Sequence, residues 1–572
     1  MSAASLSGGR RFAPAFTRLA AFRPELSVES LAVIASLFFS LASNQSFFRA
    51  AAATGAMQGA SGALTFASLF VAITALHTLL LCVLLNRWTA KPLLTVLLVV
   101  NAAASHFMAA YTVYLDADML RNILHTDGKE SHELVSLHVL PAILLYGVLP
   151  SVLLWRVRLK PRPLFKATLV RVISIVLAVV VAAGALLASF QGISALMRNH
   201  RELRYLVTPG NYIVSLAQVA RDAGADRNRP REPVGLQAKV VGRPANAKPR
   251  LLVLIVGETV RAQNWGLNGY TRQTTPQLAA MMQAGVPTHS PSASSRPLNF
   301  GHVDACGSST EVSLPCMFSP WGRAHYDKDR IDHSQSLLHV LEHAGIRTLW
   351  RDNQTGCKGV CDGLAFESFE HGDVPQACTK EGCLDEALLH GLASRIANQP
   401  GDQVVVLHQL GNHGPAYYAR YPSRLRRFIP ACETSDLDRC TRGEIVNAYD
   451  NAVLYTDDFV ARAIRFAATQ AERDTALIYL SDHGESLGED GLYLHGVPYA
   501  IAPETQTRVP MVMWLSPGFA RSRGIDMACM QARSSDEVSQ DYLFHSVLGL
   551  MQVRTPEYDP AFDLFARCEA LG

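Results

Sequence analysis

The first two hundred residues contain five apolar segments, and each is long enough to cross a lipid bilayer. A membrane-spanning helix needs about 20 consecutive, mostly apolar residues. Buried helices of a soluble protein are the alternative, but so many segments with few internal charges favour membrane spans. We therefore predict a transmembrane domain of five helices over residues 1–196. The segments are residues 30–48, 66–86, 93–114, 137–155 and 172–190.

Basic residues predict which side of the membrane each connecting segment occupies. Arginines and lysines concentrate before the first span, between the second and third, and between the fourth and fifth. Since short cytoplasmic segments are enriched in these residues, we expect the N-terminus in the cytoplasm. With an odd number of spans, everything after about residue 195 then lies on the opposite side. The long basic stretch before the first span argues against a cleavable signal peptide.

The cysteines support this topology, because ten of the eleven lie beyond residue 300 and eight of them form close pairs. The pairs are Cys306/Cys316, Cys357/Cys361, Cys378/Cys383 and Cys432/Cys440. Such clusters indicate either disulfides in an oxidising compartment or zinc ligands in a reducing one. The spacings do not repeat a C-x2-C zinc pattern, so we predict disulfides. Cys529 and Cys568 are expected to pair with each other, whereas Cys82 lies in the second span.

Short β-rich runs alternate with longer helical patterns after about residue 249. The runs are residues 251–256, 347–351, 403–408, 475–480 and 510–514. This alternation predicts a mostly parallel sheet with helices on both faces, in a domain of residues 249–572. Residues 197–248 are expected to form a bridge, with an amphipathic helix within 205–219 and a polar linker over 221–231. The formal net charge of +3 argues against a nucleic-acid binder.

Three candidate metal ligands follow predicted strands. Glu258 ends the first run, and Asp482-His483 directly follows the fourth. Ligands of open α/β sheets bind beyond the carboxyl ends of the strands, and carboxylate oxygen with imidazole nitrogen suits zinc. The hydroxyl of Thr310, within the Cys306/Cys316 loop, could fill the open position and become a nucleophile. The alternative is that Asp482 caps a helix and His483 is a turn residue.

Further polar residues suit a phosphoryl-transfer site. His413 follows another predicted strand, His495 lies twelve residues after His483, and Lys358 lies in the Cys357/Cys361 loop. Charge spreads over the phosphoryl oxygens during transfer, so cations and imidazoles are expected around it. Taken singly, each is better explained as an ordinary surface or core residue. The basic run that contains Arg420, Arg424, Arg426 and Arg427 indicates either a solvated face or docking to anionic lipids.

These motifs resemble the phosphoethanolamine transferases of Gram-negative bacteria that modify lipid A, a group that includes the mobile colistin-resistance enzymes. The matching segments are residues 257–259, 306–319, 413–415 and 481–486, and the resemblance covers essentially the full length. It implies an alkaline phosphatase/sulfatase-like domain with a mixed sheet covered by helices on both faces. It also implies an inner-membrane protein whose catalytic domain lies in the periplasm, and we expect a monomer.

The resemblance implies a two-step reaction. Thr310, activated by zinc, attacks the phosphate of phosphatidylethanolamine, and diacylglycerol leaves. A lipid A phosphate then takes phosphoethanolamine from the threonine, which is expected to lower sensitivity to polymyxin because lipid A loses negative charge. By the resemblance, the first zinc would be held by Glu258, Thr310, Asp482 and His483. The phosphate or a second zinc would contact Lys358, His413 and His495. Asn122 and Glu130 match positions proposed to bind ethanolamine.

Two positions depart from the family pattern. Ser308 replaces a threonine, and its hydroxyl or that of Ser309 could compete with Thr310. Gln540 stands where many relatives have histidine.

Other functions remain to be weighed. A transferase of the same fold could act on lipopolysaccharide core sugars or, with a phosphoglycerol donor, on periplasmic glucans. A sulfatase is disfavoured because no C-x-P-x-R sequence is present. A non-enzymatic sensor is disfavoured because every expected ligand position is filled.

Overall fold

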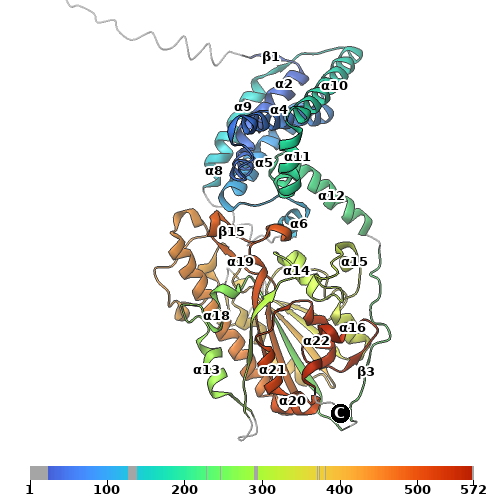
Figure 1. Ribbon diagram of the computed structural model, residues 1–572, viewed down its shortest axis with the longest axis vertical. Coiled ribbons are helices and arrows are strands. Elements are labelled where there is room, and N and C mark those ends of the chain that lie inside the picture. Colours follow the sequence, from blue (N-terminus) through green and yellow to red (C-terminus); the bar gives the residue numbers. More distant parts are fainter. Residues whose placement is uncertain are drawn as a thin grey trace, which may run out of the picture. The chain divides into compact units, whose positions relative to one another are not determined.

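Figure 1 shows the computed structural model of the chain, which describes residues 23–125, 138–226, 229–244, 246–288, 294–369, 372, 374–379 and 382–569. The chain divides into two compact units. Unit 1 combines Met1–Ala110 with Leu137–Ser215, and unit 2 combines Tyr111–Ser136 with Leu216–Gly572. Unit 1 is mostly helical, whereas unit 2 is built around a large sheet.

Within the described residues, four helical segments are long and apolar enough to cross a membrane. They are α4 (Gly59–Leu84), α5 (Ala90–Tyr111), the continuous α8, η2 and α9 (Val139–Ala142, Ile143–Val148 and Leu149–Arg156) and α10 (Leu164–Ala188). The first predicted span is broken into α2 (Val28–Phe38) with the π-helical turn η1 (Phe39–Ser43), and α3 (Gln45–Ala53), which are bent by 52°. The structure thus has four spans, or five if the bent pair is one span.

Asn44 lies at this bend and is fully buried. Its Nδ2 donates to the carbonyl oxygens of Phe39 at 2.9 Å and Thr208 at 2.7 Å, and its Oδ1 accepts from the Thr208 N–H at 3.0 Å. Backbone groups that a broken helix leaves unpaired in an apolar environment must be satisfied by such partners. The remaining elements of unit 1 are β1 (Glu25–Leu26), β2 (Arg158–Leu159), α11 (Phe190–Asn199) and η3 (Arg201–Leu206).

Unit 2 contains an eight-stranded sheet with the order β17-β7-β16-β13-β4-β12-β8-β9. The strands are β4 (Arg250–Gly257), β7 (Leu298–Asp304), β8 (Arg347–Asp352), β9 (Phe366–Ser368), β12 (Gln403–His408), β13 (Asp474–Ser481), β16 (Arg508–Leu515) and β17 (Val538–Ser539). The five adjacent strands from β13 to β9 are parallel. β16 is antiparallel to both of its neighbours, β13 and β7. The sheet is therefore mixed.

The central strands are buried on both faces, which accounts for their continuous apolar sequences. Leu252, Leu254 and Val256 of β4 pack in one core with α16 (Leu337–His343) and α22 (Tyr542–Leu550). α18 (Arg442–Ala468) packs against β13 and β4 on the other face (Figure 1). The other helices of unit 2 include α13 (Pro276–Ala284), α14 (Thr310–Met317), α15 (Lys328–Asp332), α17 (Leu392–Ala397), α19 (Glu504–Thr507), α20 (Pro517–Arg523) and α21 (Met527–Arg533).

The bridge differs from the prediction. Helix α12 runs over Gly210–Asp226, so the expected linker is helical as far as residue 226. Alanine and arginine in this stretch have high helix propensity, and Arg121 forms an ion pair with Asp222 of the helix.

All five predicted disulfides are present, and Cys82 is a buried free cysteine of α4. The bonds join Cys306–Cys316, Cys357–Cys361, Cys378–Cys383, Cys432–Cys440 and Cys529–Cys568.

Candidate active site

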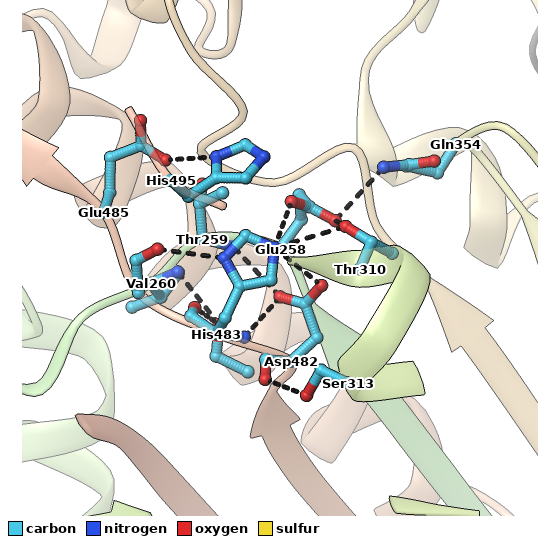
Figure 2. A network of polar contacts seen from close by, with 12 residues as sticks. Glu258, Thr259, Val260, Thr310, Ser313, Gln354, Asp482, His483, Glu485 and His495 are labelled. Atoms are coloured by element: carbon cyan, nitrogen blue, oxygen red, sulfur yellow. Dashed lines mark hydrogen bonds and ion pairs between the residues drawn. The ribbon is translucent and has the colours of Figure 1, made fainter. Parts of the chain in front are cut away.

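Two neighbouring parallel strands bring acidic and imidazole side chains together at their carboxyl ends. In the β4–β13 pairing, Gly257 lies opposite Ser481. Glu258 and the Asp482-His483 pair, which follow, are therefore adjacent, and all three side chains are fully buried. Figure 2 shows them pointing toward one another. The alternative in which Asp482 caps a helix is not supported, because a strand ends before it and no helix begins after it.

Thr310 is the first residue of α14 and contacts this cluster. Its Oγ1 lies 3.1 Å from Glu258 Oε2 and 3.2 Å from His483 Nε2 (Figure 2). The preceding Ser309 is extended, and the Cys306–Cys316 bond ties the loop before α14 to the helix itself. A helix N-terminus favours negative charge. The hydroxyl is therefore placed where a proton acceptor and a favourable field coincide.

Hydrogen bonds set the orientation of the histidine rings. His483 Nδ1 lies 2.9 Å from the Gly484 carbonyl oxygen, so Nδ1 carries the proton and Nε2 presents a lone pair to Thr310. Burial lowers the pKa of His483 to about 4. His495 Nδ1 lies 3.0 Å from Glu485 Oε2, which fixes that ring in the same way. The ring of His495 lies 4.5 Å from that of His483 and 5.4 Å from that of His413.

The cluster fits a bound cation. Glu258 Oε1 and Asp482 Oδ2 are buried and have no hydrogen-bond partner among the described residues. Burial raises the pKa of Glu258 well above its ordinary value, and the Asp482 carboxylate raises it further. Ligand atoms of Glu258, His483 and His495 lie within 4.8 Å of one another. Unpaired buried carboxylate oxygens are costly unless a positive charge lies between them, and this donor set suits zinc.

A chain of hydrogen bonds connects Lys358 with Glu258. Lys358 Nζ donates to Thr355 Oγ1 at 2.7 Å, and Thr355 Oγ1 donates to Gln354 Oε1 at 2.6 Å. Gln354 Nε2 in turn donates to Glu258 Oε2 at 3.1 Å. Gln354 was not among the predicted site residues. It lies just past the end of β8, and polar residues at such strand ends are candidates for the site.

The helix that carries Asn122 lies beside this cluster. Within unit 2, α6 (Ala117–His125) places His125 Nδ1 3.1 Å from Oε2 of Glu311, the residue after Thr310. Its Met119 side chain lies so close to Gly496, next to His495, that a β-carbon there would be 2.6 Å from the methionine methyl. Asn122 is therefore near the site, whereas Glu130 lies outside the described residues.

Comparison with known proteins decides the family. The family "Phosphoethanolamine transferase EptA/EptB" matches residues 73–223, and "Sulfatase" matches residues 250–553. EptA of Escherichia coli K12 is 36% identical over 560 residues, which cover 96% of this chain and 98% of that protein. Mcr-1 of E. coli is 36% identical and covers 86% of this chain and 90% of its own. The chain belongs to the EptA family of phosphoethanolamine transferases.

The solved structure of EptA from Neisseria meningitidis is also similar, with a TM-score of 0.89 and 36% identity over 96% of this chain and 100% of that chain. This likeness confirms an integral membrane protein with an alkaline phosphatase/sulfatase-like domain. The expected mixed sheet with helices on both faces is thus confirmed.

Side-chain contacts bear on two open questions about this phosphoethanolamine transferase. The Ser308 hydroxyl donates to the Val497 carbonyl oxygen at 2.5 Å, so its proton is already engaged.

The basic run that contains Arg420, Arg424, Arg426 and Arg427 is not one free cationic face, because Arg420 is buried and donates to the His413 carbonyl oxygen. Arg424 and Arg426 form ion pairs with Asp458 and Glu433. Arg424, Arg426 and Arg427 are exposed, and docking to anionic lipids through them stays a prediction.

Proposed function

We propose that this chain transfers phosphoethanolamine from phosphatidylethanolamine to a lipid A phosphate, with Thr310 as the nucleophile. The observation that carries the proposal is the position of Thr310 Oγ1 at the start of α14, within 3.2 Å of both Glu258 Oε2 and His483 Nε2. Membership of the EptA family supports the transferred group. The name of the similar Mcr-1, a phosphatidylethanolamine transferase, supports the donor.

We further propose that Glu258, Thr310, Asp482 and His483 hold one zinc ion, and that Lys358, His413 and His495 contact the phosphate or a second zinc. When bound, zinc would supply positive charge that favours the deprotonated Thr310 hydroxyl and the charge of the transferring group. The unpaired oxygens of Glu258 and Asp482 support this assignment.

The residues of the chain account for two displacements at phosphorus. In the first, Thr310 Oγ1 bonds to phosphorus, its proton moves to a neighbouring acceptor such as Glu258 Oε2, and the bond to the diacylglycerol oxygen breaks. That oxygen takes up this proton and leaves as diacylglycerol. In the second, an oxygen of the acceptor phosphate bonds to phosphorus and gives up its proton, and Thr310 Oγ1 leaves and takes up that proton. Lys358 and the imidazoles would stabilise charge on the phosphoryl oxygens.

The substrate side and the topology are part of the proposal. Asn122 and Glu130 would bind the ethanolamine group, and the position of α6 beside Glu311 and Gly496 supports this for Asn122. We propose five spans, with the bent pair as one, over residues 1–196, a bridge over 197–248 and a periplasmic catalytic domain over 249–572. The protein would be a monomer in the bacterial inner membrane with its N-terminus in the cytoplasm.

Mass spectrometry of lipid A from a host that expresses the protein tests this function, with wild type beside Thr310→Ala. We expect lipid A to gain one phosphoethanolamine with wild type only, together with lower sensitivity to polymyxin. A modification of core sugars or glucans instead would contradict the proposed acceptor and favour the related transferase. If lipid A gained the group without a change in polymyxin sensitivity, the proposed phenotype would be wrong.

A further inference from the structure

Gln540 is fully buried, and its amide group makes four hydrogen bonds to three separate segments. Its Oε1 accepts from the Cys306 N–H at 2.7 Å and lies 2.8 Å from Ser313 Oγ, whose single proton it shares with the Asp482 carbonyl oxygen. Its Nε2 donates to the carbonyl oxygens of Ser481 and Asp482, both at 2.7 Å. Two lone pairs and two N–H groups are all that a glutamine amide offers, so its hydrogen-bonding capacity is filled.

The partners allow only one orientation of this amide. The Cys306 N–H can only donate, and the two carbonyl oxygens can only accept. Rotation of the amide by 180° would place a donor against a donor and an oxygen against two oxygens, and would leave these buried groups unsatisfied. The surrounding donors and acceptors therefore fix which atom of the amide is Oε1 and which is Nε2. We call this set of contacts, which holds the three segments together, the Gln540 clamp.

The backbone of Gln540 is itself held in place. Its N–H donates to the Asp304 carbonyl oxygen at the end of β7. The next residue, Asp541, accepts the N–H groups of Arg323 at 2.5 Å and Ala324 at 2.9 Å. The clamp is thus anchored on the sheet at one end.

The segments that the clamp joins carry the residues assigned to the reaction. Ser313 lies one turn along α14 from Thr310, and its hydroxyl also lies 2.5 Å from the Asp482 carbonyl oxygen. Ser481 ends β13 and Asp482 follows it, so both carbonyl oxygens lie just before His483 in the chain. Cys306 begins the disulfide loop that leads to Thr310. Movement of α14 relative to β13 would break bonds at both ends of the Gln540 amide.

We propose that Gln540 is a positioning residue that fixes the distance between Thr310 and the Asp482-His483 pair. Gln540 has no hydrogen bond to the Thr310 hydroxyl or to the His483 imidazole. It acts through Ser313 and through the backbone of the segments that carry Thr310 and His483. This inference rests on the proposed function, because it assigns Gln540 to that reaction. A histidine side chain has only two ring nitrogens and could satisfy at most two of these contacts. The spacing in this chain therefore depends on an amide.

The test compares Gln540→Met, which keeps the length but removes every polar atom, with Gln540→His, which keeps two. Gln403→Met is the matched control. Gln403 is also buried and donates to two backbone carbonyl oxygens, those of Ile396 and Gln399, but it lies at the opposite, amino end of β12. Its loss should lower thermal stability without moving Thr310.

Two readouts on full-length protein in detergent separate positioning from general stability. One is kcat and KM for cleavage of a fluorescent phosphatidylethanolamine, and the other is zinc affinity by competition with a chelator. For Gln540→Met we expect kcat to fall about 10- to 100-fold with KM within about twofold. Zinc affinity should weaken about tenfold. Gln540→His should be intermediate, and Gln403→Met should match wild type in both.

The outcomes are distinguishable. If Gln540→Met and Gln403→Met lost stability alike but kept wild-type kcat and zinc affinity, the positioning role would be overturned. Should Gln540→Met fail to fold, Gln540→His with wild-type values would overturn it equally. If the wild type cleaved no phosphatidylethanolamine, the proposed function would fail, and the zinc affinities would still decide the role of Gln540.

Discussion

Gln354 Nε2 donates to Glu258 Oε2, the same carboxylate oxygen that faces the Thr310 hydroxyl. One oxygen therefore has two donors, and the other oxygen of Glu258 has no hydrogen-bond partner among the described residues, although His483 Nε2 lies 3.4 Å from it. This asymmetry fixes which oxygen faces the nucleophile and which is left for a cation.

Replacement of Gln354 by leucine should impair the reaction more than the fold. The variant loses one hydrogen bond to a carboxylate, worth about 1.5–3 kcal/mol, and lets Glu258 rotate. We expect kcat for phosphatidylethanolamine cleavage to fall about tenfold and zinc affinity to weaken by a similar factor. Gln354→Glu, which brings a third carboxylate to the cluster, should be worse for activity. Wild-type kinetics in Gln354→Leu would show that the contact has no role in orientation.

Thr310 and Ser308 should behave very differently when each is changed to alanine. Thr310→Ala removes the proposed nucleophile and should lower turnover by at least about 10³-fold. Ser308→Ala removes only the bond to the Val497 carbonyl oxygen and should cost about 1 kcal/mol of stability with turnover near wild type. Mass spectrometry of protein trapped with donor lipid should place phosphoethanolamine on Thr310. A residual activity in Thr310→Ala that disappears when Ser308 is also changed would show that the serine competes.

Glu258→Gln should separate metal binding from stability. Two buried carboxylates face each other without a cation, so loss of one charge should leave the chelated protein at least as stable as chelated wild type. Zinc at about 100 times its Kd should stabilise wild type by about 2.7 kcal/mol and the variant much less. Thermal unfolding with and without chelator measures both effects.

Asp385→Asn is the control for that comparison. Its buried carboxylate is fully bonded to Asn353, Gln409 and the N–H groups of Leu410 and Gly411. The change should therefore destabilise the protein equally with and without zinc. If Glu258→Gln behaved in the same way, the two facing carboxylates would not form a cation site.

The stability of unit 2 should fall as the pH rises through the range in which Asp457 ionises. Burial raises the pKa of this carboxyl to about 7, although it accepts the N–H groups of Gln277 and Leu278. Between about pH 4 and 7 the folded state keeps a proton that the unfolded state has lost, so this group costs up to about 1.4 kcal/mol per pH unit. Above about pH 7 the penalty is constant.

Asp457→Asn removes this titration. Between pH 5 and pH 8 the unfolding midpoint of wild type should therefore fall relative to that of the variant, since every other group titrates in both. An unchanged pH dependence would show that Asp457 is ionised throughout.

The sequence predicted the parts of the site that follow from local pattern. Glu258 and Asp482-His483 end apolar runs, and parallel strands necessarily bring such ends together. The antiparallel β7 was not predicted, because its alternating polar residues and internal glycine do not form an apolar run. The bend at Asn44 was not predicted either, since it depends on an amide that reaches a carbonyl oxygen 164 residues away.

The contacts of Gln354, Glu485 and Gln540 could not be predicted for a related reason. They are hydrogen bonds whose partners and directions are set by tertiary structure, and residue type alone does not reveal them. Helix α6 follows a membrane span, yet it groups with unit 2 through ion pairs such as Arg121–Asp222.

Every cysteine of unit 2 is bonded to the next cysteine along the chain, and four of the five bonds join residues ten or fewer positions apart. An oxidant that joins thiols in their order of emergence during synthesis would thus produce the native set directly, without reshuffling. Only the Cys529–Cys568 bond, with a separation of 39, must wait for a longer stretch of chain to emerge. Maturation of this protein should therefore require an oxidase throughout and depend little on an isomerase.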